Sequence, residues 1–98
     1  MHIVSRRRLK KFWEKFAESE APLRAWYKLV KSRKYADSNE LKADFGAADF
    51  LGKGMTVFDI GGNKYRLVVT MRYDLGRVYI RHVVTHTEYD RLTKGKKL

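Results

Sequence analysis

Residues 55–85 read MTVFDIGGNKYRLVVTMRYDLGRVYIRHVVT, and this stretch decides the predicted fold. β-branched and aromatic residues dominate 55–60, 64–73 and 77–85, which predicts three strands. The Gly61-Gly62-Asn63 sequence is a strong hairpin signal between the first two strands, and Asp74-Leu75-Gly76 predicts a turn before the third. We therefore expect a small, mainly antiparallel β-sheet at about residues 55–85.

Side-chain alternation along the last two of these strands separates an apolar face from an open face. The row expected on the apolar face comprises Tyr65, Leu67, Val69, Met71, Val78, Ile80 and Val84, with His82 among them. The polar side chains expected on the open face are Arg66, Arg72, Tyr79 and Arg81. A slip of one residue at the Gly76 turn would instead bring His82 to the open face.

The residues before the sheet predict a helical hairpin at about 6–34 that covers the apolar sheet face. His2-Ile3-Val4 can form a short strand, after which Ser5 can cap a helix to about residue 18. Pro22 suits the first turn of a second helix that ends near Lys34. The apolar stripes of the two helices are Leu9, Phe12, Trp13 and Phe16, and Leu23, Trp26, Tyr27 and Val30.

Shorter elements complete the predicted architecture. A further helical turn begins at Ser38 or Asn39, and Thr87 can cap a short C-terminal helix that is followed by a basic tail at 93–98. The predicted fold class is therefore α+β, with two layers in a single domain of residues 1–98.

Composition excludes several classes of protein. The 98-residue chain is 44% hydrophobic and 34% charged, which excludes a wholly disordered protein. It contains no cysteine, so disulfides, thiolate catalysis and cysteine-based zinc sites are excluded, and a reducing cytoplasm fits this composition. No apolar run approaches the roughly 20 residues needed to span a bilayer, and we expect neither a secretory signal nor a membrane partner.

The net charge of +11 predicts a polyanionic partner. Nucleic acid is the first candidate, and an acidic protein or membrane surface is the second. The positive charge is concentrated in residues 1–35 and 61–98, on either side of a mildly acidic connector at 36–60. The run Arg6-Arg7-Arg8-Leu9-Lys10-Lys11 is either a solvated helix face or a contact to RNA or the ribosome.

The C-terminal part groups residue types that suit a phosphodiester. Arginine binds phosphate oxygens, histidine can give or take a proton near neutral pH, and tyrosine offers a hydroxyl and a stacking ring. The candidates are Asn63, Arg66, Arg81, His86 and Tyr89. RNA supplies its own nucleophile, the 2′-hydroxyl, so this chemistry requires neither a metal nor a cofactor. His82 and His86 lie on a predicted strand, where an i, i+4 pair does not converge on a metal.

Other interpretations remain open at this level. Arg66 and Arg81 can be ordinary strand charges, and Tyr89 can simply dock the last helix on the core. The chain can then be a non-catalytic basic module that binds RNA or the ribosome, with salt-dependent affinity and no cleavage products. A third possibility is a protein-interaction domain for an acidic partner.

Two adjoining segments resemble HigB-type toxins of the RelE-like superfamily. Residues 57–66, VFDIGGNKYR, are similar to the family's V-F-x-[IV]-G-G-N-x-x-R segment, and residues 79–90, YIRHVVTHTEYD, are similar to its Y-I-R-x-V-x-T-H-x-E-Y-D segment. The resemblance covers about residues 39–92. It implies a RelE-like fold and an mRNA interferase, an endoribonuclease that inhibits translation on the ribosome.

The resemblance also implies partners and site residues. The expected partners are mRNA, the ribosome and a cognate helix-turn-helix antitoxin of the HigA type, with no cofactor and no metal. The residues expected to be catalytic are Arg66, Arg81, His86 and Tyr89, and those expected to bind RNA are Asn63, Lys64, Arg72, Tyr79 and Lys94. Codon specificity, ribosome dependence, and the stoichiometry and mode of neutralisation stay open.

The expected mechanism is attack of the 2′-hydroxyl on the adjacent phosphate. Arg66 and Arg81 neutralise the scissile phosphate, and His86 protonates the departing 5′-oxygen. Tyr89 or Lys64 assists deprotonation of the 2′-hydroxyl, or Tyr89 stacks a base. The products would be a 2′,3′-cyclic or 3′-phosphate and a 5′-hydroxyl.

Overall fold

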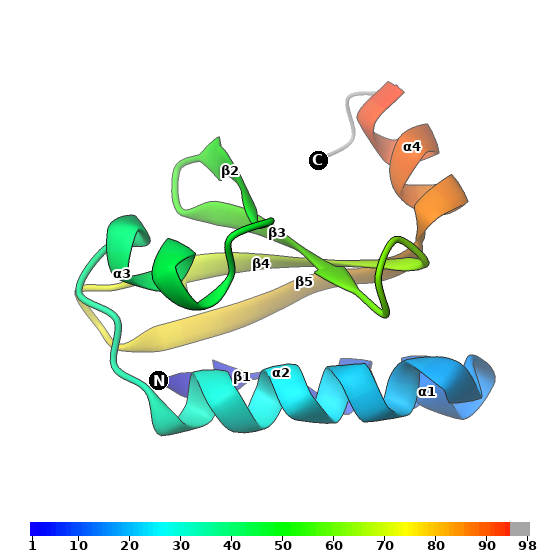
Figure 1. Cartoon of the computed structure of the whole chain (residues 1–98), viewed down its shortest axis with the longest axis horizontal. Helices are drawn as coiled ribbons and strands as arrows, with labels where there is room; N and C mark the ends of the chain where they lie inside the picture. The colour runs from blue at the N-terminus through cyan, green and yellow to red at the C-terminus, as the bar shows by residue number, and fades with distance from the viewer. Residues whose placement is uncertain (95–98) are drawn as a thin grey trace.

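A computed structural model of the chain describes residues 1–94 and contains a five-stranded sheet in the order β1-β5-β4-β3-β2 (Figure 1). The strands are β1 (His2–Val4), β2 (Asp49–Gly52), β3 (Met55–Ile60), β4 (Tyr65–Arg72) and β5 (Arg77–Thr85). All neighbouring pairs are antiparallel except β1, which runs parallel to β5. The predicted α+β class and the mainly antiparallel sheet are confirmed.

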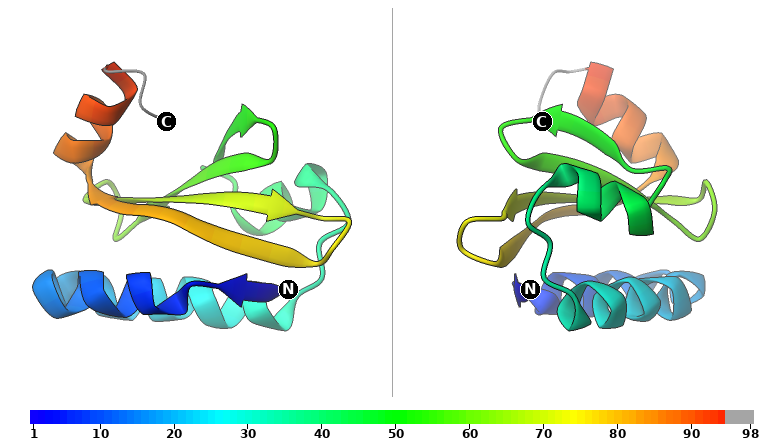
Figure 2. Two further views of the ribbon diagram at one scale, coloured as in Figure 1. Left: turned by 180° about the vertical axis from the view of Figure 1, so that it is seen from behind. Right: turned by 60° about the vertical axis from the view of Figure 1, so that its left-hand side comes forward.

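Helices lie on both sides of this sheet. The helices are α1 (Arg6–Lys15), α2 (Glu20–Ser32), α3 (Ser38–Asp44) and α4 (His86–Lys94), and the short 3-10 helix η1 (Ala17–Ser19) joins α1 to α2. Figure 2 shows α1 and α2 along one face of the sheet, whereas α4 and the β2 arm project from the opposite side. The helical hairpin thus covers one face and leaves the other to α4 and β2.

The core lies between the hairpin and the sheet, as the apolar stripes predict. Leu9 and Trp13 of α1 are buried there, and so are the buried α2 residues. They pack on the sheet row of Leu67, Val69, Met71, Val78 and Ile80. Because burial of each large apolar side chain contributes roughly 1.5–3 kcal/mol, this interface fixes which sheet face is left for function.

The alternation predicted for β5 fails beyond Ile80 because the strand contains a β-bulge. Val69 pairs with Ile80 and Val68 pairs with His82, so Arg81 is the extra residue. The bulge shifts the phase: Val83 packs against the helix-side core, and Val84 pairs with Arg66 on the other face. The expected placing of His82 and Val84 in the Val78 row was therefore wrong, although no slip occurs at the Gly76 turn.

Several boundaries also differ from expectation. Strand β2 was not predicted, because its sequence, Asp-Phe-Leu-Gly, is short and fully exposed. Ser5 occupies the N-cap of α1 with a positive φ of 75°, and its side chain makes no capping hydrogen bond. The first helix ends at Lys15, three residues early, and α2 begins two residues before Pro22. Of the predicted basic tail, Thr93 and Lys94 end α4, and the remainder lies outside the described residues.

Candidate active site

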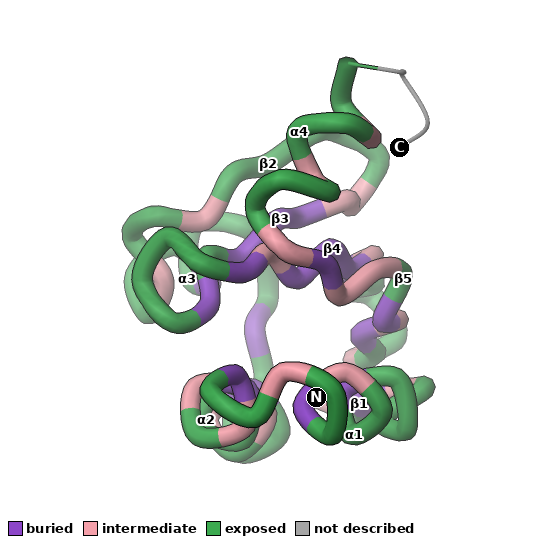
Figure 3. Tube along the Cα trace, turned by 90° about the vertical axis from the view of Figure 1, so that its right-hand side faces the viewer, coloured by how far each residue is buried: buried purple, intermediate pink, exposed green. Residues whose placement is uncertain are grey.

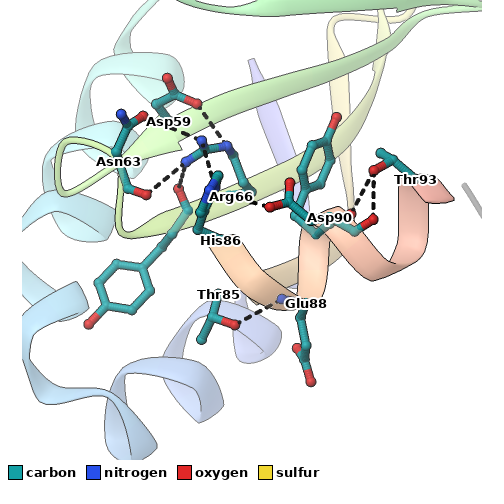
Figure 4. Close-up of polar contacts among 10 residues, drawn as sticks. Asp59, Asn63, Arg66, Thr85, His86, Glu88, Asp90 and Thr93 are labelled. Carbon is teal, nitrogen blue, oxygen red and sulfur yellow. Dashed lines mark hydrogen bonds and ion pairs between the residues drawn. The ribbon is translucent and has the colours of Figure 1, made fainter.

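Arg66 is the centre of a polar cluster where β4 meets the first turn of α4 (Figure 4). Its Nε lies 3.1 Å from Oδ1 of Asp59, on the neighbouring strand. Its Nη1 donates to the backbone oxygens of Asn63 and Tyr65, both at 3.2 Å. Its Nη2 reaches Oδ1 of Asn63 at 3.3 Å and Nδ1 of His86 at 3.1 Å. Each terminal nitrogen of this guanidinium thus makes two hydrogen bonds within the protein, Nε adjoins a carboxylate, and the side chain is only 11% exposed.

The turn before β4 positions Asn63. Gly61 and Gly62 have φ angles of 64° and 73°, a conformation in which a side chain is strained. Two successive residues in the left-handed region bring the chain round tightly enough for Asn63 to face Arg66. The glycine pair is therefore required for the cluster as well as for the hairpin.

His86 is the first residue of α4, and Thr85 holds the start of that helix. Oγ1 of Thr85 accepts a hydrogen bond from the backbone N–H of Glu88 at 3.2 Å, so the cap is Thr85 and not the expected Thr87. The backbone N–H of His86 donates to the carbonyl of Lys64 at 2.9 Å. The first bond caps the helix, and the second ties its start to the turn before β4, where the His86 ring lies beside Arg66.

The contact between Arg66 and His86 fixes the imidazole tautomer in this state. A guanidinium can only donate, so Nδ1 of His86 accepts and the ring proton resides on Nε2. Nε2 lies 3.4 Å from Oδ2 of Asp90, one helical turn further along α4. The His86 side chain is 52% exposed, so the imidazole is open to solvent.

Tyr89 completes this cluster. Cζ of Arg66 lies 5.9 Å from the centroid of its ring, within cation–π range. Burial raises the pKa of the Tyr89 hydroxyl, and the carboxylate of Asp49 in β2 raises it further, against an opposing effect of Arg66. Tyr89 therefore stays protonated at neutral pH.

Arg81 and Tyr79 form a second polar group on the same side of the sheet. Nε of Arg81 donates to Oγ1 of Thr70 at 3.0 Å, and its Cζ lies 5.5 Å from the Tyr79 ring centroid. Thr70 is four residues from Arg66 on β4, which corresponds to roughly 13 Å along a strand. The structure therefore brings Asn63, Arg66, His86 and Tyr89 together, and it places Arg81 with Tyr79 further along the sheet.

Within residues 1–94, the side chains of the other expected RNA-binding residues form no hydrogen bond or ion pair with either group. Lys64 pairs with Glu18 at 2.9 Å, and this hydrogen bond together with the charge of Glu18 raises the pKa of Lys64. Arg72 pairs with Asp74 at 2.9 Å at the far end of β4. Lys94 is an exposed residue at the end of α4.

Sequence reasoning missed three members of these groups: Asp59, Asp90 and Thr70. The first two lie inside the quoted segments 57–66 and 79–90, so the motifs contained them without assigning a role. Thr70 becomes relevant only because the bulge at Arg81 brings the two side chains into register.

The described residues provide neither a metal centre nor a membrane-spanning helix. Residues 1–94 contain no group of three or more histidine, aspartate or glutamate side chains arranged to hold a metal ion. None of the described helices is long and apolar enough to cross a membrane. What the geometry offers is a buried arginine, an accessible imidazole and a protonated tyrosine at one end of an open sheet face.

Comparison with known proteins decides the family. Residues 19–92 match the model of the HigB toxin family, the RelE-like toxic component of a toxin–antitoxin system. The chain belongs to this HigB family. Its match includes β4, β5 and most of α4, which hold the Arg66 cluster.

Full-length relatives agree with this assignment. The mRNA interferase toxin HigB of Escherichia coli K12 is 34% identical over 105 residues, covering 99% of this chain and 100% of the relative. The mRNA interferase HigB of Escherichia coli O6:H1 is 27% identical over 97 residues, covering 96% of this chain and 93% of the relative. The resemblance of the two quoted segments to HigB toxins is thus confirmed.

Proposed function

We propose that the active centre of this HigB-family mRNA interferase is the cluster of Asn63, Arg66, His86 and Tyr89. The observation that carries the proposal is the contact of Arg66 Nη2 with Nδ1 of His86, 3.1 Å apart, at an accessible edge of the sheet. A fixed cation and an orientable imidazole are the groups that cleavage of RNA by its own 2′-hydroxyl requires. The relatives named mRNA interferases support the same reaction.

Phosphate binding begins at Arg66. An arriving phosphate competes with His86 for Nη2, while Nε and Nη1 keep their bonds to Asp59 and the backbone. The guanidinium is thereby held in place as one N–H turns to the substrate. Arg81, whose terminal nitrogens lie further along the sheet, binds a neighbouring phosphate of the same strand rather than the scissile one.

The same exchange prepares His86 as a general acid. When Nη2 leaves Nδ1, the ring can take a second proton, and Asp90 beside Nε2 stabilises the resulting imidazolium. The imidazolium then gives the Nε2 proton to the departing 5′-oxygen, while the 2′-hydroxyl forms its bond to phosphorus and releases its own proton to solvent water. The products are a 2′,3′-cyclic phosphate and a 5′-hydroxyl.

Neither residue expected to deprotonate the 2′-hydroxyl suits that role. The pairing with Glu18 raises the pKa of Lys64, which keeps its ammonium charged. Burial raises the pKa of Tyr89, which keeps its hydroxyl protonated. We assign Tyr89 to stacking a base beside the scissile bond, since its ring adjoins Arg66.

Cleavage mapping tests the function. Purified protein is incubated with mRNA alone and with mRNA on translating ribosomes, in the presence of a chelator, and the ends of the products are analysed. We expect 2′,3′-cyclic phosphate and 5′-hydroxyl ends from the wild type, and none from a variant that combines Arg66→Ala with His86→Ala. Full cleavage by that folded double variant would place the active centre elsewhere.

The same proposal includes the cellular setting. The partner is a cognate helix-turn-helix antitoxin of the HigA type, the substrate is mRNA on the ribosome, and the compartment is the bacterial cytoplasm. The charge of +11 supports binding to both RNA and an acidic antitoxin surface. If mapping shows tight, salt-dependent RNA binding without products, the chain is a non-catalytic RNA-binding module instead.

A further inference from the structure

A basic groove runs along the outer edge of β5, next to the strand pair that holds the Arg66 cluster. Its first part, of about 450 Å³, lies between α1 and β5 and is lined by residues that include Phe12, Val83 and Val84. A second hollow of about 340 Å³ lies between β5 and α4. The two parts share His82 and Val84, so they adjoin each other at the β5 edge. Figure 3 shows the β5 edge between α1 and α4.

The backbone at this edge is available for pairing. Strand β1 pairs with β5 only at Arg77, Val78 and Tyr79, and no strand described within residues 1–94 continues that pairing beyond Tyr79. The carbonyl of Arg81 accepts a hydrogen bond from Nη1 of Arg8 at 2.7 Å. Residues 82–85 pair with β4 on one edge, and on their outer edge they pair with no strand of the described chain. Such an open edge commonly accepts an added strand.

The rim of the groove is cationic and lacks carboxylate partners. Arg8, Lys11 and Lys15 line it from α1, Arg81 lines it from β5, and Arg91 lines it from α4. In the part of the chain that the structure describes, none of these five side chains forms an ion pair. Glu88 is the one acidic residue that lines either part of the groove. The charge of the groove thus complements an acidic ligand.

The floor favours a peptide over RNA. Val83 faces the helix-side core and Val84 the opposite face of β5, and aliphatic groups on both faces suit the alternating side chains of a peptide strand. The one aromatic ring, Phe12, is stacked on Phe16 with centroids 4.6 Å apart and meets Tyr65 edge-on at 5.5 Å. Its faces are therefore engaged within the protein, whereas single-stranded RNA relies on free aromatic faces for base stacking.

We propose that the groove binds an acidic, extended segment of the antitoxin, which adds as a strand to residues 82–85 of β5. Alternate side chains of that segment enter the apolar floor, and acidic ones meet Lys11 and Lys15. The identity of the partner as an antitoxin rests on the proposed function. Val84 of β5 pairs with Arg66 of β4. A strand added at the outer edge of β5 therefore lies beside the active centre without occupying it.

Fluorescence anisotropy with a defined probe tests the proposal. The probe is a short labelled peptide of alternating glutamate and valine, and its control is the same peptide N-methylated at alternate residues, which cannot pair as a strand. We expect saturable binding of the first peptide to the full chain and at least about tenfold weaker binding of the second, the equivalent of about 1.4 kcal/mol. Equal binding of both, or no binding of either, would overturn the proposal.

Matched variants locate the site. Lys11→Glu combined with Lys15→Glu reverses two charges in the groove, and Lys28→Glu combined with Lys42→Glu reverses two exposed charges on α2 and α3. We expect the first pair of substitutions to weaken peptide binding by about tenfold or more, and the second pair to change peptide binding little. Equal losses would contradict a local site. Displacement of the peptide by a short RNA would overturn the proposal and identify the groove as an RNA-binding surface.

RNA cleavage provides an independent readout. We expect the Lys11→Glu, Lys15→Glu variant to cleave mRNA at close to the wild-type rate, because neither lysine belongs to the Arg66 cluster. A large loss of cleavage would contradict the separation of groove and active centre. Peptide binding does not require catalysis, so failure of the proposed nuclease function would leave the binding result interpretable.

Discussion

Nη2 of Arg66 lies 3.1 Å from Nδ1 of His86, and this pair links a strand in the middle of the sheet to the first turn of α4. The contact requires Nδ1 to be unprotonated, because both partners would otherwise be donors. The free protein thus holds His86 in a form that cannot act as an acid. Substrate phosphate, by drawing Nη2 away, would release that constraint.

This exchange predicts a change in the protonation of His86. Nitrogen NMR of the imidazole in the free protein should show Nε2 protonated and Nδ1 free. Addition of an oligonucleotide whose 2′-hydroxyls are replaced by hydrogen should produce the doubly protonated ring. In the Arg66→Lys variant, the protonation of His86 should depend less on the oligonucleotide, since a lysine cannot keep the remaining four contacts of Arg66. An unchanged His86 tautomer in the wild-type complex would contradict the exchange.

Tyr89 should act through its ring and not through its hydroxyl. Because burial raises its pKa, the phenolate does not form near neutral pH, so Tyr89→Phe should cleave RNA within a few fold of the wild type and with the same pH profile. Tyr89→Ala should raise KM by about 10- to 100-fold, in line with the roughly 1–3 kcal/mol of a base–aromatic stack. Equal defects in the two variants would assign the hydroxyl a catalytic role.

The cap of α4 should control the position of His86. Thr85→Val removes the oxygen that accepts from the Glu88 N–H, and we expect a loss of about 1 kcal/mol in the local stability of α4. Hydrogen exchange of the α4 amides measures this loss. Thr87→Val, a matched change at an exposed position, should leave exchange nearly unaltered. Identical exchange in the two variants would show that Thr85 does not cap the helix.

Tyr35 should make stability depend on alkaline pH. Burial and its 2.6 Å hydrogen bond to Asp44 raise the pKa of Tyr35 well above the ordinary value of 10.0. The unfolded chain therefore releases this proton first, and the contribution to stability is present below about pH 10 and is lost as pH rises further. Tyr35→Phe should cost roughly 1–3 kcal/mol at neutral pH and reduce the fall in Tm above about pH 10.

A second tyrosine provides the control for this dependence. Tyr27 is half-buried on α2, where its ring packs against the core. Tyr27→Phe should keep the alkaline slope of the wild type. If Tyr35→Phe keeps that slope as well, other groups account for the alkaline loss of stability.

Much of the architecture could be predicted because its signals are local. The apolar spacing in α1 and α2, and the Gly61-Gly62 turn, each specify an element within a few residues. The bulge at Arg81 could not be predicted, because it depends on how β5 fits β4 and not on any residue type. Strand β2 has too few apolar residues to be predicted from the sequence, and it pairs with β3 alone.

The candidate site was likewise predicted only in part. The motifs indicated Asn63, Arg66, His86 and Tyr89 correctly as neighbours, since they lie at the junctions of predicted elements. They could not separate Arg81 from Arg66, because strand alternation places both on one face without measuring the distance along it. Nor could they show that Lys64 is paired with Glu18, which is distant in sequence and meets it only in the folded chain.

The role of His86 as the general acid is the central claim, and the leaving group tests it most directly. An RNA containing the mapped cleavage site is prepared with its ordinary 5′-oxygen, or with sulfur in that position, since a thiolate departs without protonation. His86→Gln should lose about a hundredfold or more in rate on the oxygen substrate and approach the wild type on the sulfur substrate. Arg81→Ala should show the same loss on both. An equal defect of His86→Gln on the two substrates would contradict the account.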